Sequence, residues 1–160
     1  MEQLWSPWRM KYIEQHNHAG DCVFCEAIKC AEDGAQNLIL HRGRLAFVIL
    51  NAYPYSNGHL MVVPYVHQPT LEDLACEIRA EMMELVTQAM TVLRGVYHPE
   101  AFNMGANIGA AAGAGIAAHV HIHVLPRWTG DTNFMSTIGQ TRVLPEELPE
   151  TYRRIRDAWK

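Results

Sequence analysis

The most regular pattern in the chain is a strict alternation of histidine and aliphatic residues over positions 119–125. Successive side chains of a β-strand point to opposite faces of the sheet, so this segment is predicted to be a strand. One face then carries three histidines, which are His119, His121 and His123. The other face carries three aliphatic residues, which a half-buried sheet would pack into its core. A helix would instead distribute the same residues around its circumference.

Four further segments combine β-forming residues with flanking turn signals and are predicted to be strands. In chain order they are 38–41, 45–50, 59–64 and 101–105. A short Arg-Gly turn separates the first two, as in a hairpin. A loop rich in proline, asparagine and glycine precedes the third, and such residues favour turns.

One long helix is predicted over residues 71–96, where apolar residues recur with helical spacing. Thr70 and Asp73 resemble a capping box at its start. Gly95 and Pro99 mark its exit, because both residues disfavour continuation of a helix.

Two shorter helices are expected near the ends of the chain. One lies within residues 22–29, and the other opens at Pro145 with acidic residues that suit the helix dipole. Tyr152, Ile155 and Trp159 give the second helix one apolar stripe. Together these elements predict an α+β fold, an antiparallel sheet of about five strands with one long helix and a C-terminal helix.

The chain has 160 residues, enough for one domain that buries about two thirds of its unfolded surface. We expect a single domain over 1–160, with an N-terminal arm at 1–20, a core at 21–135 and a C-terminal helical segment at 136–160. The arm is irregular and rich in tryptophan, so it is expected to dock on the body or on a second subunit.

Charge and hydropathy exclude some classes of function. The net charge is −4 with neutral histidines, and no run of lysine or arginine occurs, which argues against binding a nucleic acid polymer. A small anionic ligand needs only a few local donors and stays possible. No apolar run reaches the roughly 18 residues of a membrane span, and the N-terminus lacks the pattern of a signal peptide. We therefore expect a cytoplasmic protein.

Cys22 and Cys25 form a Cys-x-x-Cys pair with the spacing of zinc ligands. A redox pair is the alternative, although the βαβ pattern typical of thioredoxin-like sites is not visible. A closed zinc site needs four ligands, and His67 and His119 would complete it. The zinc would be structural, because it would hold the strand that presents His121.

Three imidazoles on one strand face allow three interpretations. They could be incidental surface histidines, although nine histidines seldom align in this way. They could be metal ligands, since imidazole is the commonest protein ligand for metals. Alternatively, one imidazole could attack phosphorus and form a covalent intermediate. Residue type alone does not separate the last two interpretations.

A loop rich in glycine and alanine, residues 106–118, leads into the histidine segment. Its Gly113-x-Gly115 is followed by a predicted strand, so it is not a dinucleotide-binding fingerprint, and the Gly-Lys-Ser/Thr of a P-loop is lacking. Small residues let backbone N–H groups approach an anion closely. Gly113 and Gly115 are therefore candidates for a phosphate cradle, and a merely flexible loop is the alternative.

The segment from His119 to Arg127 resembles the signature of the histidine triad superfamily, whose members are hydrolases and transferases acting on nucleoside phosphates. The resemblance covers roughly residues 5–140. The bacterial branch related to diadenosine tetraphosphate hydrolases and phosphorylases is similar in three further segments, which are Trp5-Ser6-Pro7-Trp8, Cys22-Val23-Phe24-Cys25 and the stretch from Arg127 to Met135.

This resemblance implies a role for several residues. His121 would be the nucleophile that attacks the α-phosphate, and His123 would hydrogen-bond a phosphate oxygen. Asn51 matches the position that contacts the ribose hydroxyls, and Asn107 matches the amide that contacts the phosphate or the leaving group. In members with Cys-x-x-Cys, the four cysteine and histidine residues named above bind zinc. The family forms dimers, so a homodimer is implied.

The chain departs from the family pattern just before the triad. Many members carry Gly-Gln-Ser or Gly-Gln-Thr there, and the hydroxyl assists the leaving group. Here the segment from Gly113 to Ile116 has no such side chain. Nucleoside phosphoramidates, dinucleoside polyphosphates and adenylyl sulfate therefore remain open as substrates, as do hydrolysis and phosphorolysis.

These observations favour a zinc-containing enzyme acting on a small nucleotide. It would cleave the α-phosphate linkage of dinucleoside polyphosphates through a covalent nucleotidyl-His121 intermediate. A nucleoside phosphoramidate hydrolase of the same superfamily is one alternative. The others are a nucleotide-binding regulatory module with negligible turnover, and a zinc-dependent interaction protein whose histidines all bind metal.

Overall fold

The computed structural model of the chain describes residues 22–131 and 144–159. The expected N-terminal arm at 1–20, with Trp5 and Trp8, lies outside the described residues. Of the expected C-terminal segment at 136–160, residues 144–159 are described. No helix within the described ranges is long and apolar enough to cross a membrane.

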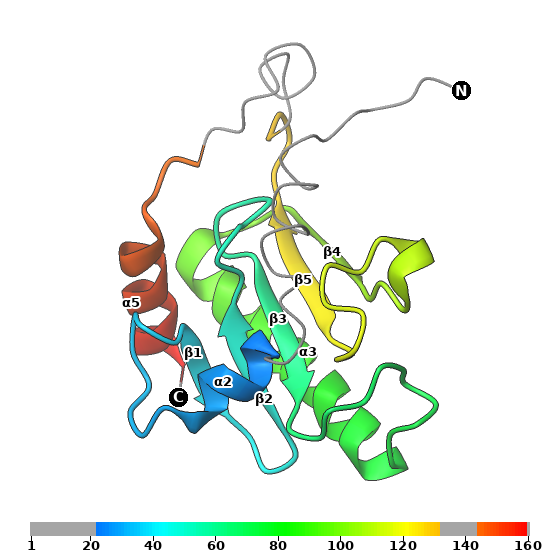
Figure 1. Cartoon of the computed structure of the whole chain (residues 1–160). Helices are drawn as coiled ribbons and strands as arrows, with labels where there is room; N and C mark the ends of the chain where they lie inside the picture. Colours follow the sequence, from blue (N-terminus) through cyan, green and yellow to red (C-terminus); the bar gives the residue numbers. More distant parts are fainter. Residues whose placement is uncertain (1–21, 132–143, 160) are drawn as a thin grey trace, which may run out of the picture.

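Five antiparallel strands form one sheet, in the order β1-β2-β3-β5-β4 (Figure 1). The strands are β1 at Ile39–Arg42, β2 at Ala46–Leu50, β3 at Leu60–Pro64, β4 at Ala101–Gly105 and β5 at Ile122–Arg127. The predicted α+β fold with about five strands is therefore confirmed, and β1 to β4 lie within one residue of their predicted positions.

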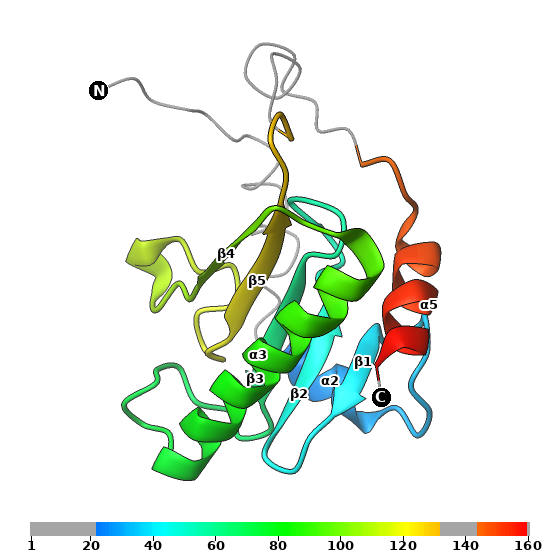
Figure 2. The same ribbon diagram turned by 180° about the vertical axis from the view of Figure 1, so that it is seen from behind.

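Helices cover both faces of this sheet. The long helix α3, Cys76–Tyr97, crosses one face, and the C-terminal helix α5, Leu148–Ala158, packs beside α3 and β1 on that side (Figure 2). The short helix α2, Val23–Lys29, lies over the other face (Figure 1). Because of this arrangement, β2 and β3 are buried at every position. Alternate residues of these strands join two separate hydrophobic clusters, one under α3 and one under α2.

The histidine segment enters the sheet later than predicted. Strand β5 begins at Ile122, not at His119, because Val120 donates its backbone N–H to the carbonyl of Gln68, outside the sheet ladder, at 2.7 Å. The predicted alternation nevertheless holds. Val120, Ile122 and Val124 all belong to the cluster under α3. The three alternating histidines lie on the opposite side, where Phe24 of α2 contacts His119 and His121.

The predicted start of the long helix is wrong. Helix α3 begins at Cys76, and its N-cap residue, Ala75, makes no side-chain capping bond. The hydroxyl of Thr70 donates to the carboxylate of Asp73 at 3.1 Å, so the expected capping box does not form. At the other end, Gly95 lies inside the helix, and the chain leaves it through His98 in the left-handed conformation, φ 48°.

The C-terminal helix closes the core beside β1. Helix α5 begins at Leu148, three residues after the predicted opening at Pro145. Of the predicted apolar stripe, Tyr152 and Ile155 are buried, and the Tyr152 hydroxyl donates to the carbonyl of Ile39 at 3.0 Å. The Trp159 side chain stacks on His41 with ring centroids 5.2 Å apart.

Replacement of Leu93 by alanine is expected to lower the free energy of unfolding by about 2–5 kcal/mol, because the side chain is fully buried between α3 and the sheet and its loss leaves a cavity. Urea unfolding followed by circular dichroism measures the change. Met83 lies on the same helix and is 46% exposed, so Met83→Ala is the matched control and should stay within about 0.5 kcal/mol of the parent. Equal effects of the two substitutions would contradict the assignment of the core.

Candidate active site and metal centre

Two cysteines and two histidines from three segments of the chain form one cluster. The ligand atoms of Cys22, Cys25, His67 and His119 all lie within 4.8 Å of one another. The Cys22 Sγ is 3.3 Å from the His119 Nδ1, which is also 3.7 Å from the Cys25 Sγ. The Cys25 Sγ is 3.3 Å from the His67 Nδ1. The predicted set of metal-ligating residues is thus brought together by the fold.

The dimensions of this cluster fit a tetrahedral metal ion. With zinc–nitrogen and zinc–sulfur bonds of about 2.0–2.3 Å, tetrahedral ligands lie about 3.5 Å apart, close to the distances between the cysteine and histidine atoms. The Nε2 of His119 lies 2.9 Å from the carbonyl oxygen of Pro64. A carbonyl only accepts, so Nε2 carries the proton and the lone pair of Nδ1 faces the two thiols. Burial also lowers the pKa of His119, which favours the neutral, metal-binding form.

His121 follows two residues later, and its lone pair is on Nε2, whereas that of His119 is on Nδ1. Its Nδ1 is 2.9 Å from the carbonyl oxygen of His119, so Nδ1–H donates and Nε2 keeps its lone pair. The side chain is 4% exposed, and burial lowers the pKa of His121. A neutral imidazole with an unprotonated Nε2 is the form that can act as a nucleophile.

A buried histidine that the sequence analysis did not single out determines the state of His123. The Tyr55 backbone N–H donates to the Nδ1 of His59 at 3.1 Å, so in neutral His59 the proton sits on Nε2. This Nε2 is 2.9 Å from the Nδ1 of His123, to which it donates. His123 therefore carries its own proton on Nε2, as a donor. The available sequence signal was a polar residue at the head of the otherwise apolar segment 59–64.

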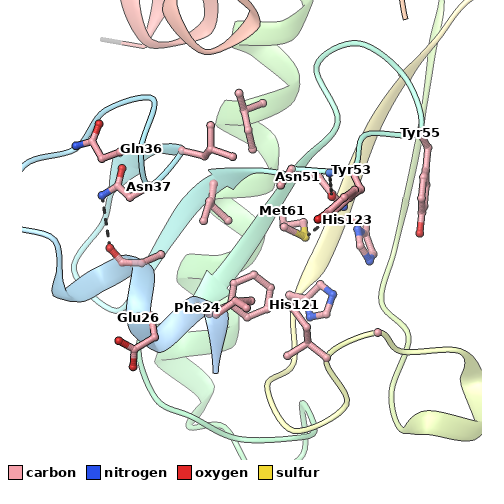
Figure 3. Close-up of a pocket in the computed structure, with 18 of the residues that line it drawn as sticks. Phe24, Glu26, Gln36, Asn37, Asn51, Tyr53, Tyr55, Met61, His121 and His123 are labelled. Atoms are coloured by element: carbon pink, nitrogen blue, oxygen red, sulfur yellow. Dashed lines mark hydrogen bonds between the residues drawn. The ribbon is translucent and has the colours of Figure 1, made fainter. Parts of the chain in front are cut away.

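A cavity of about 480 Å³ opens beside His121 and His123 (Figure 3). Three apolar lining residues, Phe24, Leu38 and Ile49, belong to one hydrophobic cluster, and the part of the wall that they form is called the apolar end below. Among the described lining residues there is no lysine or arginine, and Glu26 is the one charged side chain. The cavity is of the size that small-molecule sites use, and His121 and His123 are its chemically reactive groups.

Most of the predicted substrate-binding residues meet at this cavity. Asn51, Asn107 and Gly115 line it together with the two histidines. Gly113 is not among the lining residues, and its predicted part in a phosphate cradle stays a prediction. It ends a short 3₁₀ helix with φ 81°, a left-handed conformation that suits glycine.

Phe24 joins the metal cluster to the cavity. It lies between the two cysteines in sequence and is 1% exposed. Its ring centroid is 5.3 Å from that of His119 and 5.0 Å from that of His121. Its aromatic character was visible in the Cys-Val-Phe-Cys segment, but its position against both histidines depends on where α2 packs on the sheet.

The antiparallel sheet thus presents two histidines to one cavity, His121 with an unprotonated Nε2 and His123 with a protonated one, while His119 faces a Cys/His cluster. This arrangement defines the histidine triad class of proteins. The HIT domain model matches residues 34–130, and the chain belongs to this family.

Known relatives agree with this assignment. The chain is 38% identical to an AP-4-A phosphorylase of Mycobacterium tuberculosis over 99% of this chain and 85% of the relative. It is 33% identical to an adenylylsulfatase of Arabidopsis thaliana over 72% of this chain and 56% of that protein. A zinc-bound histidine triad family protein from Mycobacterium smegmatis has the same fold, with a TM-score of 0.70 and 28% identity over 87% of this chain and 93% of that one. The chain is accordingly an enzyme of the HIT family.

The Cys/His cluster is expected to hold one metal ion per chain. Replacing both Cys22 and Cys25 by serine should remove most of the metal, because two of four ligands are lost. Metal content of the purified proteins, measured by plasma mass spectrometry, tests this. Cys30→Ser is the matched control, since this exposed cysteine lies outside the cluster. A double variant that keeps its full metal content would contradict the assignment.

Proposed function

We propose that the protein is a nucleotidyl hydrolase or transferase that cleaves the α-phosphate linkage of dinucleoside polyphosphates. The observation that carries this proposal is the pair of defined tautomers in one cavity, an Nε2 lone pair on His121 beside an Nε2–H on His123. A nucleophile and a donor for a phosphate oxygen are the two groups that such a transfer requires. The 38% identity to an AP-4-A phosphorylase supports the choice of substrate class.

The reaction has two steps. In the first, Nε2 of His121 attacks the α-phosphorus, the bond from phosphorus to the bridging oxygen breaks, and the leaving polyphosphate departs with the bonding electrons. In the second, water or inorganic phosphate attacks the same phosphorus, and the phosphorus–nitrogen bond breaks. His121 is thereby returned to its neutral form. The relation to a phosphorylase favours inorganic phosphate as the acceptor.

The walls of the cavity suggest how a nucleotide lies. The base would pack in the apolar end against Phe24 and Leu38, and Asn51 would contact the ribose. Asn107, the backbone N–H of Gly115 and His123 would then face the phosphate oxygens. Because no lysine or arginine is among the described lining residues, N–H dipoles would supply the stabilisation of charge on phosphorus.

We assign zinc to the Cys/His cluster, with a structural role. Two thiolates and two imidazoles are typical zinc ligands, and the zinc-bound protein from M. smegmatis supports this choice. When bound, the ion would hold the ring of His119, whose carbonyl in turn holds His121 by the 2.9 Å hydrogen bond. The homodimer and the cytoplasmic location stay predictions.

Replacement of His121 by alanine is expected to lower turnover of diadenosine tetraphosphate by at least about 10³-fold, because the nucleophile is removed. Chromatography of the products, with and without inorganic phosphate, measures this. A phosphorylase yields ADP and ATP only with phosphate, whereas a hydrolase yields AMP and ATP without it. The control is His98→Asn, at an exposed position outside the cavity whose left-handed backbone asparagine tolerates. Near-parental activity of His121→Ala would contradict the proposal, as would parental enzyme that takes up no label from α-labelled substrate.

Replacement of His59 by phenylalanine is expected to lower the chemical step about 10²-fold with little change in KM, because His123 would lose the donor that keeps its proton on Nε2. Single-turnover kinetics, together with KM from steady-state rates, separate the two effects. A variant with a raised KM and an unchanged chemical step would show that His59 acts on binding instead.

A further inference from the structure

Four aromatic rings follow one another along a wall of the cavity (Figure 3). In order they are Phe24, His121, His123 and Tyr55, with successive ring centroids 5.0, 4.8 and 6.3 Å apart. Phe24 belongs to the apolar end of the cavity. Tyr55 lies on the far side of His123, away from that end (Figure 3). The row therefore continues beyond the residues that the proposed transfer uses.

A second tyrosine of the same loop lies at the mouth of the cavity. Tyr53 lines the cavity and is 48% exposed. It is the one aromatic residue among the large hydrophobic side chains that are exposed in the part of the chain the structure describes. Its backbone N–H donates to the Oδ1 of Asn51 at 2.8 Å.

Tyr55 is held in place by His59. Its backbone N–H donates to the Nδ1 of His59, and its ring packs on that imidazole with centroids 4.7 Å apart. Each of these two tyrosines is thus tied to a polar residue of the site. The backbone of the loop between β2 and β3 is thus held at both tyrosines, and the Tyr55 ring is also held by the imidazole of His59, which reduces the entropy that a ligand must offset on binding.

The position of these rings determines which part of a substrate they meet. With a nucleoside in the apolar end and its α-phosphorus at His121, the leaving group emerges past His123, toward Tyr55 and the cavity mouth. Cations would be needed there to select a bare polyphosphate, and none is among the described lining residues. Aromatic rings instead stack on nucleobases, and they do so with little regard to which base is present.

We propose that Tyr53 and Tyr55 form a subsite for the second nucleobase, the one that departs with the leaving group. The subsite makes the enzyme select dinucleoside over mononucleoside polyphosphates, and it accepts any base in the leaving half. This inference rests on the proposed function, since it concerns the leaving half of the same reaction.

Two substrates with the same reacting linkage test the subsite. Diadenosine tetraphosphate and adenosine 5′-tetraphosphate both transfer an adenylyl group to His121, and both release a triphosphate chain through the same kind of oxygen. Only the first carries a second base. We expect kcat/KM to be about tenfold or more higher for diadenosine tetraphosphate, as stacking of one base implies.

The variants Tyr53→Leu and Tyr55→Leu should each reduce this ratio, whereas Tyr53→Phe and Tyr55→Phe should retain it because the ring remains. Met83→Ala, with similar exposure to Tyr53 but on the outer face of α3, should leave both rates unchanged. The ratio cancels any effect of Tyr55 on His59 and His123, since damage to the chemical step slows both substrates equally.

A ratio near one in the parental enzyme would overturn the subsite, and so would leucine variants that slow both substrates equally. In either case the transfer itself would still be observed, and the proposed function would stand. Failure to form adenylyl-His121 from both substrates would overturn the proposed function and the subsite together.

Discussion

The site depends on His119, which is fully buried and bonded at three points. Its Nε2–H donates to the carbonyl of Pro64, at the end of β3, and its Nδ1 faces the thiols of the Cys/His cluster. Its backbone carbonyl accepts the Nδ1–H of His121. One residue therefore connects the sheet, the metal cluster and the candidate nucleophile. Loss of any of these bonds would leave a buried polar group unsatisfied, which is costly in this environment.

Backbone groups also determine which nitrogen of each histidine carries a proton. A carbonyl can only accept, and an N–H can only donate, so the main chain at His119 and at Tyr55 assigns the tautomers of His121 and His59. His59 then passes the assignment on to His123. The two side chains that face the cavity consequently differ in kind, one with a lone pair and one with a proton. Burial also lowers the pKa of His121, which favours its neutral form.

The fold tolerates these buried polar groups because the two faces of the sheet differ in composition. Val120, Ile122 and Val124 join the core under α3, and this core contains most of the buried aliphatic residues. The opposite face carries the smaller cluster around Phe24, next to which the histidines lie. Burial of apolar side chains on one side of β5 therefore supplies most of the stability. The histidines lie on the other side, where hydrogen bonds satisfy their buried nitrogens.

The sequence by itself determined the alternation at 119–125, the α+β class and the grouping of Cys22, Cys25, His67 and His119, because these follow from local periodicity and ligand chemistry. Only the tertiary structure decided where the segments end and what they meet. Strand β5 starts at Ile122 because Val120 bonds to the distant Gln68, and no local pattern records that contact. The roles of His59 and Phe24 were hidden for the same reason. An imidazole bonded to another residue 64 positions away, or a ring packed against two histidines, depends on how separate elements come together, and a period read along the chain carries no information about it.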